Sequence, residues 1–414
     1  MNWHIDPGTL PATPRFRSHC KLDLGAELDK LDRLRAVGLP DAVAFYAGRI
    51  VEATTMDIIS RLGLRTSRSS TPESTHINLE LIATSGRVDD GAVACANVIR
   101  RIGNHARHMD REIRTGEEVV IVALLQLWIE SWTEFVKGDR ADSRVPESDW
   151  SELTRVVRQI VGGQPHELAS LFDANDDCPP RLIVEPTLAG FLAERTVDAG
   201  MSHADGFTRK VVGLFPKDKR AQQIRALYLS RNARAAEAVR VLESVLRWRY
   251  GNDRETLGIL GGAYKNLWVE SGDSRHLERS HTFYRRTPCD GEAGYYLLIN
   301  AAATGLWLGD AVQARAQAYA AEENLKRHGI DEAYLLGSTR AYWLTATLAE
   351  AKLLMGKVRP ALRLYSHARD IDRSGGRWKR TRTQLSVHLR HLLVVRRTDD
   401  MAKGLVALAE EVHR

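Results

Sequence analysis

One stretch of the sequence places arginine, asparagine and histidine on neighbouring turns of an expected helix. Arg101 and His108 are seven residues apart, which puts them ~20° from one line along a helix. Asn104 precedes His108 by one turn and is placed to orient it. His105, five residues after Arg100, is an alternate to His108. Histidine can move a proton near neutral pH and arginine can stabilise charge on a phosphate, so residues of these types could carry out proton transfer beside a phosphate.

The same stretch has a structural interpretation. Gly103 and Asn104 can cap a helix and let two helices or two subunits approach closely, because glycine has no Cβ. His108 then hydrogen-bonds a backbone group. A lone arginine–histidine pair on a helix is not specific for catalysis, so we favour this interpretation, and an enzymatic activity is not the primary expectation.

A second candidate site is the basic segment over residues 357–397. It holds twelve Lys and Arg against two Asp, a charge of +10, so the rest of the chain carries about −4 of the net +6. Such a concentration of charge attracts phosphates or an acidic partner. The candidate residues for phosphate or nucleic-acid contact are Arg377, Trp378, Lys379, Arg380, Arg382 and Arg390. Trp378 would stack on a base.

The alternative for this segment is a solvated helix face with Trp378 packed in the core. If the segment binds a ligand, then RNA, a nucleotide and an acidic protein are all open, because charge contact does not distinguish them.

The sequence indicates no metal, cofactor or membrane site. Its four cysteines, Cys20, Cys95, Cys178 and Cys289, form no CxxC pair, so we expect no zinc site and a reducing, cytoplasmic compartment. No phosphate-binding glycine loop or dinucleotide motif is present, so no cofactor is expected. The longest apolar run, residues 119–125, is far shorter than the ~20 residues of a membrane span, and we expect no membrane association.

The elements that carry these residues are expected to be helices. Apolar residues recur at steps of three and four, for example along residues 41–64 and 118–135, and no long stretch alternates with a period of two. We therefore predict an all-α protein. Its parts are a loose arm over residues 1–22, a helical bundle over 23–137, a linker with a short helix over 138–185, and helical repeats over 186–414.

The C-terminal half has the spacing of stacked helical hairpins. Expected turns at Asn232, Gly272, Gly309 and Gly356 are 40, 37 and 47 residues apart, longer and less regular than the ~34 residues of a tetratricopeptide repeat. Glycines in the run 258–262 suit close helix packing. Hairpins of this kind stack to bury their apolar faces and leave a concave surface. The pattern predicts an α-solenoid that binds a segment of another protein.

The first helical region resembles a HEPN-type domain, of the subfamily often attached to bacterial restriction and defence proteins. The resemblance covers residues 25–137 and is most specific at Gly103, Asn104 and His108, which resemble the family's Gly-Asn-x-x-x-His. Arg49 and Glu52 resemble the family's first-helix Arg and Glu. The resemblance implies self-association as a homodimer.

Some HEPN proteins are metal-independent endoribonucleases that use an Arg and a His at a site shared by two copies. This sequence departs from them, because Gly103 stands where the active members have Arg. If the resemblance extends to catalysis, the residues that would carry it are Arg101, Asn104 and His108, with His105 as the alternate.

The second half resembles the TRAF-binding helical-repeat domain of MAP kinase kinase kinases and its bacterial relatives. The resemblance spans residues 185–392 and is most evident at Glu255-Thr256-Leu257-Gly258, Tyr264-Lys265, Ile299-Asn300-Ala301-Ala302 and Tyr342-Trp343. It implies a non-catalytic, tetratricopeptide-like repeat that binds other proteins. Large aromatic side chains are effective in such contacts. The candidate partner-binding residues are Tyr264, Lys265, Trp268, Tyr342 and Trp343.

Together these features predict a cytoplasmic regulatory or adaptor protein that self-associates through its first domain. Its repeat would bind a partner protein, in bacterial defence or stress signalling. The alternative is a metal-independent HEPN endoribonuclease that the repeat regulates.

Overall fold

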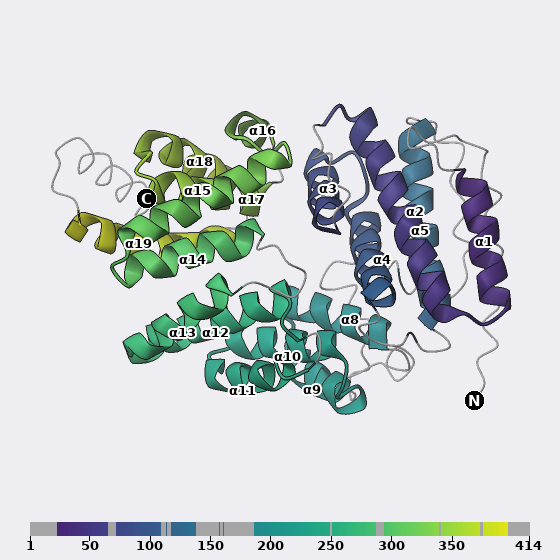
Figure 1. Cartoon of the computed structure of the whole chain (residues 1–414), viewed down its shortest axis with the longest axis horizontal. Coiled ribbons are helices and arrows are strands. Elements are labelled where there is room, and N and C mark those ends of the chain that lie inside the picture. Colours follow the sequence, from purple (N-terminus) through teal and green to yellow (C-terminus); the bar gives the residue numbers. More distant parts are fainter. Residues whose placement is uncertain are drawn as a thin grey trace. The chain divides into compact units, whose positions relative to one another are not determined.

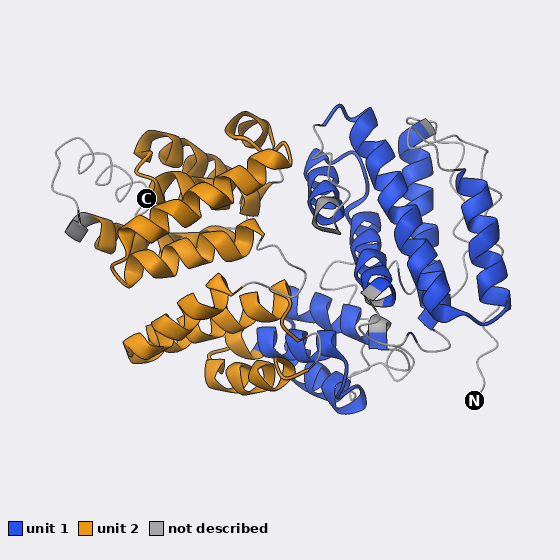
Figure 2. Ribbon diagram, in the orientation of Figure 1, with its two compact units in different colours: residues 1–228 blue, residues 229–414 orange. Residues whose placement is uncertain are grey.

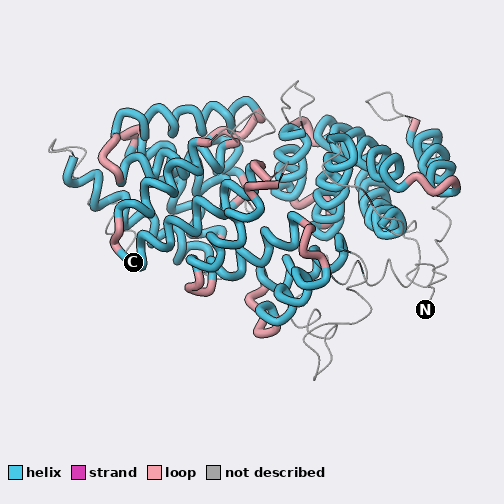
Figure 3. Tube along the Cα trace, turned by 60° about the horizontal axis from the view of Figure 1, so that its bottom comes forward, coloured by secondary structure: helices cyan, strands magenta, loops and turns pink. Residues whose placement is uncertain are grey.

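The computed structural model describes residues 23–64, 72–108, 113, 117–137, 157, 160, 186–248, 251–286, 294–338, 341–372 and 376–395. Across these residues it contains seventeen α-helices and no strand (Figure 3). The predicted all-α fold is therefore confirmed for this part of the chain. The predicted arm over residues 1–22 and nearly all of the predicted linker over 138–185 lie outside the described residues.

The chain divides into two compact units, residues 1–228 and 229–414 (Figure 2). The division falls within helix α10 (Lys219–Arg231), whereas the repeat is predicted from the sequence to start at residue 186. The first unit therefore includes α8 (Pro186–Asp198) and α9 (Ala204–Leu214). The predicted domain boundaries stay a prediction.

Helix α2 (Pro40–Arg61) is the central helix of the first unit, and it packs against four neighbours (Figure 1). These are α1 (Leu24–Ala36), α3 (Pro72–Ser85), α4 (Asp90–His108) and α5 (Glu117–Lys137). The helix begins at Pro40, whose fixed φ suits a first helical position. The apolar stripe expected from the sequence is buried, with Val43, Ile50 and Ile58 closed to solvent. This arrangement places the Asn104 motif of α4 beside the middle of α2.

Helix α5 is apolar along most of its length. Over Glu117–Val136 it is long and apolar enough to cross a membrane, and no other helix in the described residues meets that condition. However, 61% of this apolar window is buried within the fold. Its indoles also find partners there: Trp128 Nε1 donates to Thr54 Oγ1 at 2.7 Å, and Trp132 Nε1 donates to Asp57 Oδ2 at 3.1 Å. Burial with such partners is what a core helix of a bundle requires.

In the part of the second unit that the structure describes, helical hairpins are followed by one long helix. The hairpins are α12 (Arg254–Ser271) with α13 (Ser274–Arg285), α14 (Tyr295–Trp307) with α15 (Ala311–Arg327), and α17 (Tyr342–Leu354) with α18 (Val358–Ile371). The other helices are α11 (Ala235–Val245), the short α16 (Glu332–Gly337) and α19 (Gly376–Val395). Successive hairpins contact one another, as in a solenoid.

The hairpin turns lie where the sequence predicts them. Gly272, Gly309 and Gly356 adopt positive φ angles of 69°, 90° and 81°, a conformation that favours glycine just after a helix. Asp273 and Asp310 follow two of these glycines and accept hydrogen bonds from the first turn of the next helix. The predicted hairpin spacing is therefore confirmed.

The glycines of α12 serve close packing, as expected. A Cβ on Gly258 would lie 2.8 Å from the ring of Tyr296, and one on Gly261 would lie 2.8 Å from the ring of Tyr284. Both aromatic rings therefore rest directly on the backbone of α12.

Candidate functional site

A polar pocket lies between α2, α3 and α4, next to the motif that the sequence singles out. Its lining residues are Phe45, Gly48, Glu52, Thr75, Arg100, Gly103, Asn104 and Arg107. Arg107 Nη2 lies 3.7 Å from Glu52 Oε2, and the Arg107 guanidinium lies 5.9 Å from the centroid of Phe45. Arg107 and Glu52 are each about one-third exposed, so this ion pair adds little stability. The pocket therefore combines cationic, anionic and amide groups that solvent reaches.

Gly103 is the point at which α4 crosses α2. A Cβ at this position would lie 3.1 Å from Gly48 Cα and 3.1 Å from the carbonyl oxygen of Ala44. The close helix crossing that the structural interpretation expects is therefore present within a single chain. It also explains why a larger residue does not fit at this position.

The side chains of Arg101 and Asn104 have different surroundings in the fold. Asn104 lines the pocket, whereas Arg101 Nη2 lies 3.3 Å from Glu194 Oε2 on α8. The other oxygen of Glu194 accepts from Arg220 Nη2 at 2.6 Å. Burial opposes the ionisation of Glu194, but the charges of Arg220 and Arg101 outweigh it and lower the pKa of that carboxyl to about 2. Arg101 therefore helps to hold α8 against α4.

The side chains of His105 and His108 lie outside the described residues, so their catalytic role stays a prediction. Sequence reasoning missed Arg107 as a pocket residue. A signal was present, because Arg107 follows Asn104 by three residues and Arg100 by seven, and such residues share one face of a helix.

The candidate partner-binding aromatic residues differ in exposure. Tyr264 and Tyr342 are buried, whereas Trp343 is 49% exposed. The Tyr264 hydroxyl donates to Glu243 Oε1 at 2.6 Å and accepts from Arg279 Nη1 at 2.8 Å. Burial raises the pKa of Tyr264, and the hydrogen bond to Glu243 adds to the increase. Of the three side chains, Trp343 presents the most surface to a partner.

Lys265 and Trp268, the other two candidates, lie in a polar and aromatic cluster inside the second unit. Lys265 Nζ donates to Asn300 Oδ1 at 3.2 Å and to Gln384 Oε1 at 3.0 Å. The ring of Trp268 stacks on Trp307, with 5.3 Å between centroids. Burial lowers the pKa of Lys265, and the Glu350 carboxylate opposes that shift. Lys265 and Asn300 come from two different motifs of the second resemblance, and the fold brings them together.

Glu350 on α17 accepts two hydrogen bonds from α19 in this cluster. Gln384 Nε2 donates to Glu350 Oε1 at 2.7 Å, and His388 Nε2 lies 2.7 Å from the same oxygen. Trp307 Nε1 donates to His388 Nδ1 at 3.2 Å. Sequence reasoning missed Glu350 and Gln384 as site residues, because nothing local marks residues that meet only in the folded chain.

The outward face of α19 is cationic. Lys379, Arg380, Arg382 and Arg390 are exposed, and no carboxylate among the described residues forms an ion pair with them. Arg377 is also exposed, with its guanidinium 5.9 Å from the ring centroid of Tyr342. These positions of the basic segment are therefore available for contact with an anion.

Trp378 lies on the inner side of this segment. Its ring packs edge-on to Tyr365, with 6.4 Å between centroids, and its backbone N–H donates to Asp372 Oδ2 at 2.7 Å. The residue is half-buried, which is closer to the packed alternative than to an open stacking platform.

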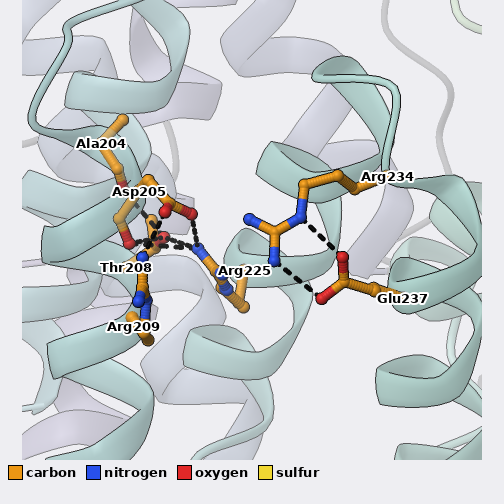
Figure 4. Close-up of polar contacts among 7 residues, drawn as sticks. All are labelled: Ala204, Asp205, Thr208, Arg209, Arg225, Arg234 and Glu237. Carbon is orange, nitrogen blue, oxygen red and sulfur yellow. Dashed lines mark hydrogen bonds and ion pairs between the residues drawn. The ribbon is translucent and has the colours of Figure 1, made fainter.

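Helices α9 and α10 are joined by a buried arginine (Figure 4). Arg225 Nη1 donates to Asp205 Oδ1 at 2.7 Å and to Thr208 Oγ1 at 2.9 Å. Burial opposes the ionisation of Asp205, but the Arg225 hydrogen bond and charge lower the pKa of its carboxyl. Figure 4 also shows Arg234 bound to Glu237 through two parallel hydrogen bonds of 2.6 and 2.7 Å at the start of α11. Arg225 therefore links α9 to α10, and the Arg234–Glu237 pair lies at the start of the next helix.

Residues 200–305 match the family model described as TPR-S: Tetratricopeptide Repeats-Sensor. This part of the chain is a tetratricopeptide-like helical repeat. The match covers about a quarter of the chain, from α9 into α14. No curated protein matches the chain.

The repeat predicted from turn spacing is confirmed by this match. The finer resemblances, to a HEPN domain and to the TRAF-binding domain, stay predictions. The matched residues include the α12–α13 hairpin with its glycines Gly258 and Gly261, whereas Glu350 on α17 lies beyond the match.

Proposed function

We propose that this chain is a regulatory or adaptor protein whose repeat binds an acidic segment of a partner protein. The observation that supports this most is the cationic outward face of α19, on which Lys379, Arg380, Arg382 and Arg390 have no carboxylate partner among the described residues. Tetratricopeptide-like repeats commonly bind proteins. The description of the matching family as a repeat sensor is consistent with a regulatory role.

An acidic protein fits this face better than a single-stranded nucleic acid does. Sequence-tolerant binding of single strands uses several exposed aromatic rings, on which successive bases stack. Here Trp378 is half-buried against Tyr365, and the ring beside the Arg377 guanidinium is that of the buried Tyr342. Charge contacts therefore dominate the surface.

The test uses the full chain and a fluorescent polyglutamate peptide as the probe. We expect binding that weakens steeply with added salt, and at least about tenfold weaker binding after Lys379→Glu with Arg390→Glu. The matched control is Arg240→Glu with Arg315→Glu, two exposed arginines on α11 and α15. Equal weakening by both pairs, or absence of peptide binding at low salt, would contradict the proposal. Preference for a single-stranded RNA of equal charge would replace it with nucleic-acid binding.

Under the same proposal, the first unit supplies self-association, as its resemblance to HEPN domains implies, and the protein works in the cytoplasm in defence or stress signalling. A gel-filtration or ultracentrifugation measurement of the full chain is expected to show a dimer. A monomer at all concentrations would remove this part of the proposal.

Ribonuclease activity is the second candidate function, and the pocket beside Asn104 is the observation that favours it. Arg100 and Arg107 line this pocket and could neutralise a phosphate. Against it, Arg101 is paired with Glu194. We expect no RNA cleavage by the purified protein in a metal-free buffer. Cleavage that His108→Ala abolishes, with folding and dimerisation intact, would establish the ribonuclease instead.

A further inference from the structure

Helix α19, the last helix among the described residues, lies against the first helix of each of the three hairpins α12–α13, α14–α15 and α17–α18. Gln384 bonds Lys265 of α12, and His388 bonds Trp307 of α14. Both residues also bond Glu350 of α17. A helix that only capped the end of a solenoid would contact the last hairpin alone. Helix α19 instead runs along the surface that the three inner helices form together.

The contacts are complementary in hydrogen-bonding direction as well as in position. The Gln384 amide oxygen accepts from the Lys265 ammonium at 3.0 Å, while its amide nitrogen donates to Glu350 at 2.7 Å. Because an indole N–H can only donate, Nδ1 of His388 must be the acceptor from Trp307. The proton of the neutral imidazole is then on Nε2, which donates to Glu350 at 2.7 Å. Two residues of α19, four apart, therefore satisfy three groups on three helices.

The hydrogen-bond network of Gln384 and His388 is buried, and burial of polar groups is a costly way to hold a helix in place permanently. His388 is completely buried, and Glu350 is only 12% exposed. A buried polar network requires desolvation of every group and often stabilises no more than well-packed apolar side chains would. What such a network provides is discrimination, because a helix without the matching groups leaves buried donors and acceptors unpaired.

We propose that α12, α14 and α17 form a helix-binding groove, that α19 is its internal occupant, and that a partner helix replaces α19. The partner helix carries an amide and an imidazole four residues apart, at the places of Gln384 and His388. The inference rests on the proposed protein-binding role of the repeat, but it concerns the inward face of α19 rather than its cationic face. The cationic face stays outside while α19 is seated, so an acidic partner can reach it first.

The first experiment measures backbone hydrogen exchange in the full chain. Gln384→Ala with His388→Ala is expected to accelerate exchange in α19 by about tenfold or more, because hydrogen bonds to a charged group are lost, while α14 and α15 keep their rates. The control is Thr383→Ala with Ser386→Ala, since both hydroxyls bond only the backbone of α19 itself. Equal acceleration in α14 and α19, or no acceleration relative to the control, overturns the proposal.

The second experiment uses a labelled synthetic peptide with the sequence of residues 376–395 as the probe. We expect it to bind the full chain carrying Gln384→Ala and His388→Ala at least about tenfold more tightly than the wild-type chain, in which α19 already fills the groove. Adding Glu350→Ala to that chain should abolish binding, and so should the two alanines in the peptide. Equal binding to both chains overturns the proposal.

These outcomes separate the two proposals. Failure of the polyglutamate probe with success of the α19 peptide removes the acidic partner and keeps the groove. A dimer in which two copies exchange α19 would make a second copy the occupant and overturn the assignment to a partner helix. The single variant Glu350→Gln, which keeps side-chain size and an acceptor oxygen, provides a folded chain if the alanine variants do not fold. It should accelerate exchange in α19 relative to the wild-type chain, and unchanged exchange in α19 would again overturn the groove.

Discussion

Gly103 shows how a single residue restricts what α4 can do. A side chain at this position would meet the backbone of α2 at 3.1 Å. An arginine could be accommodated only if α2 and α4 moved apart. The geometry therefore opposes any substitution by a larger residue at this position.

Gly103→Ala is expected to destabilise the first unit by about 1–3 kcal/mol, because the new methyl group overpacks the crossing of α2 and α4. The measurement is urea unfolding followed by circular dichroism. The control is Gly213→Ala in α9, where a Cβ meets nothing within 4 Å. There alanine should be neutral or slightly stabilising, since it favours the helix. Equal effects of the two substitutions would show that the crossing is not tightly packed.

Glu194 is expected to make the first unit sensitive to acid. Its carboxyl pKa is lowered from 4.5 to about 2, so its contribution to stability is complete above pH 4.5 and disappears as the pH falls toward 2. Glu194→Gln should therefore destabilise the protein at neutral pH, by on the order of 3 kcal/mol, and have little effect near pH 2. Urea midpoints across this pH range provide the measurement. Asp29→Asn, at an exposed carboxylate of α1, is the control. A destabilisation by Glu194→Gln that does not change with pH would contradict the assignment.

Residue type indicated the exposure of the basic candidate residues but not the exposure of the candidate tyrosines. The basic side chains of α19 are exposed, as their charge requires. Tyr264 and Tyr342, chosen as groove residues because aromatic side chains bind well, are buried with internal hydrogen bonds. Periodicity does not reveal which side of a helix a neighbouring helix covers, so exposure of a tyrosine could not be read from the sequence.

At the scale of helices, local sequence signals are sufficient to predict the hairpin turns but not the position at which α19 packs. Turns at Gly272, Gly309 and Gly356 follow from glycine's access to positive φ, which is a property of the residue itself. The seating of α19 depends on Lys265 and Gln384, which are 119 residues apart. No short-range pattern records such a pairing, so the network around Glu350 could not be predicted.

Helices α15 and α17 are linked by a buried carboxylate that supplies another test. Glu322 is 1% exposed, and its Oε1 lies 2.9 Å from Lys352 and 2.7 Å from Lys326. Burial opposes ionisation of Glu322, but the hydrogen bonds from these lysines lower its pKa. Glu322→Gln should destabilise the second unit by about 1–3 kcal/mol, because Lys352 loses its buried counter-charge.

The matched control for that variant is the neighbouring Glu323→Gln. Glu323 is 34% exposed and pairs with Lys326, a pair of the kind that contributes little. Its substitution should change the urea midpoint by no more than the equivalent of ~0.5 kcal/mol. If both variants are equally mild, Glu322 is not a structural link between α15 and α17.

At the scale of the whole molecule, the start of the family match and the division between the compact units fall at different residues. The family match begins at residue 200, within the first compact unit, and continues to residue 305 in the second. The family match depends on the sequence pattern of the repeating helices. The division into compact units depends on which helices pack against one another. The division at residue 228 falls inside α10, where composition does not change, and the sequence therefore provides no sign of it.

The two compact units are expected to unfold in separate transitions in differential scanning calorimetry. Gly103→Ala should lower one transition temperature and Glu322→Gln the other, because the two substituted residues belong to different compact units. The double variant should show both shifts with little coupling between them. A single transition that both substitutions lower together would mean that the chain unfolds as one cooperative body.

The stacked indoles of Trp268 and Trp307 give the second unit a built-in optical signal. Their rings lie 5.3 Å apart at an interplanar angle of 23°, and the imidazole of His388 lies 5.3 Å from the Trp307 ring. Two chromophores this close couple their excited states and produce a paired band in circular dichroism, and a neighbouring imidazole changes the emission of an indole. Departure of the last helix would remove the imidazole from that environment, so its attachment can be followed by spectroscopy without an introduced dye.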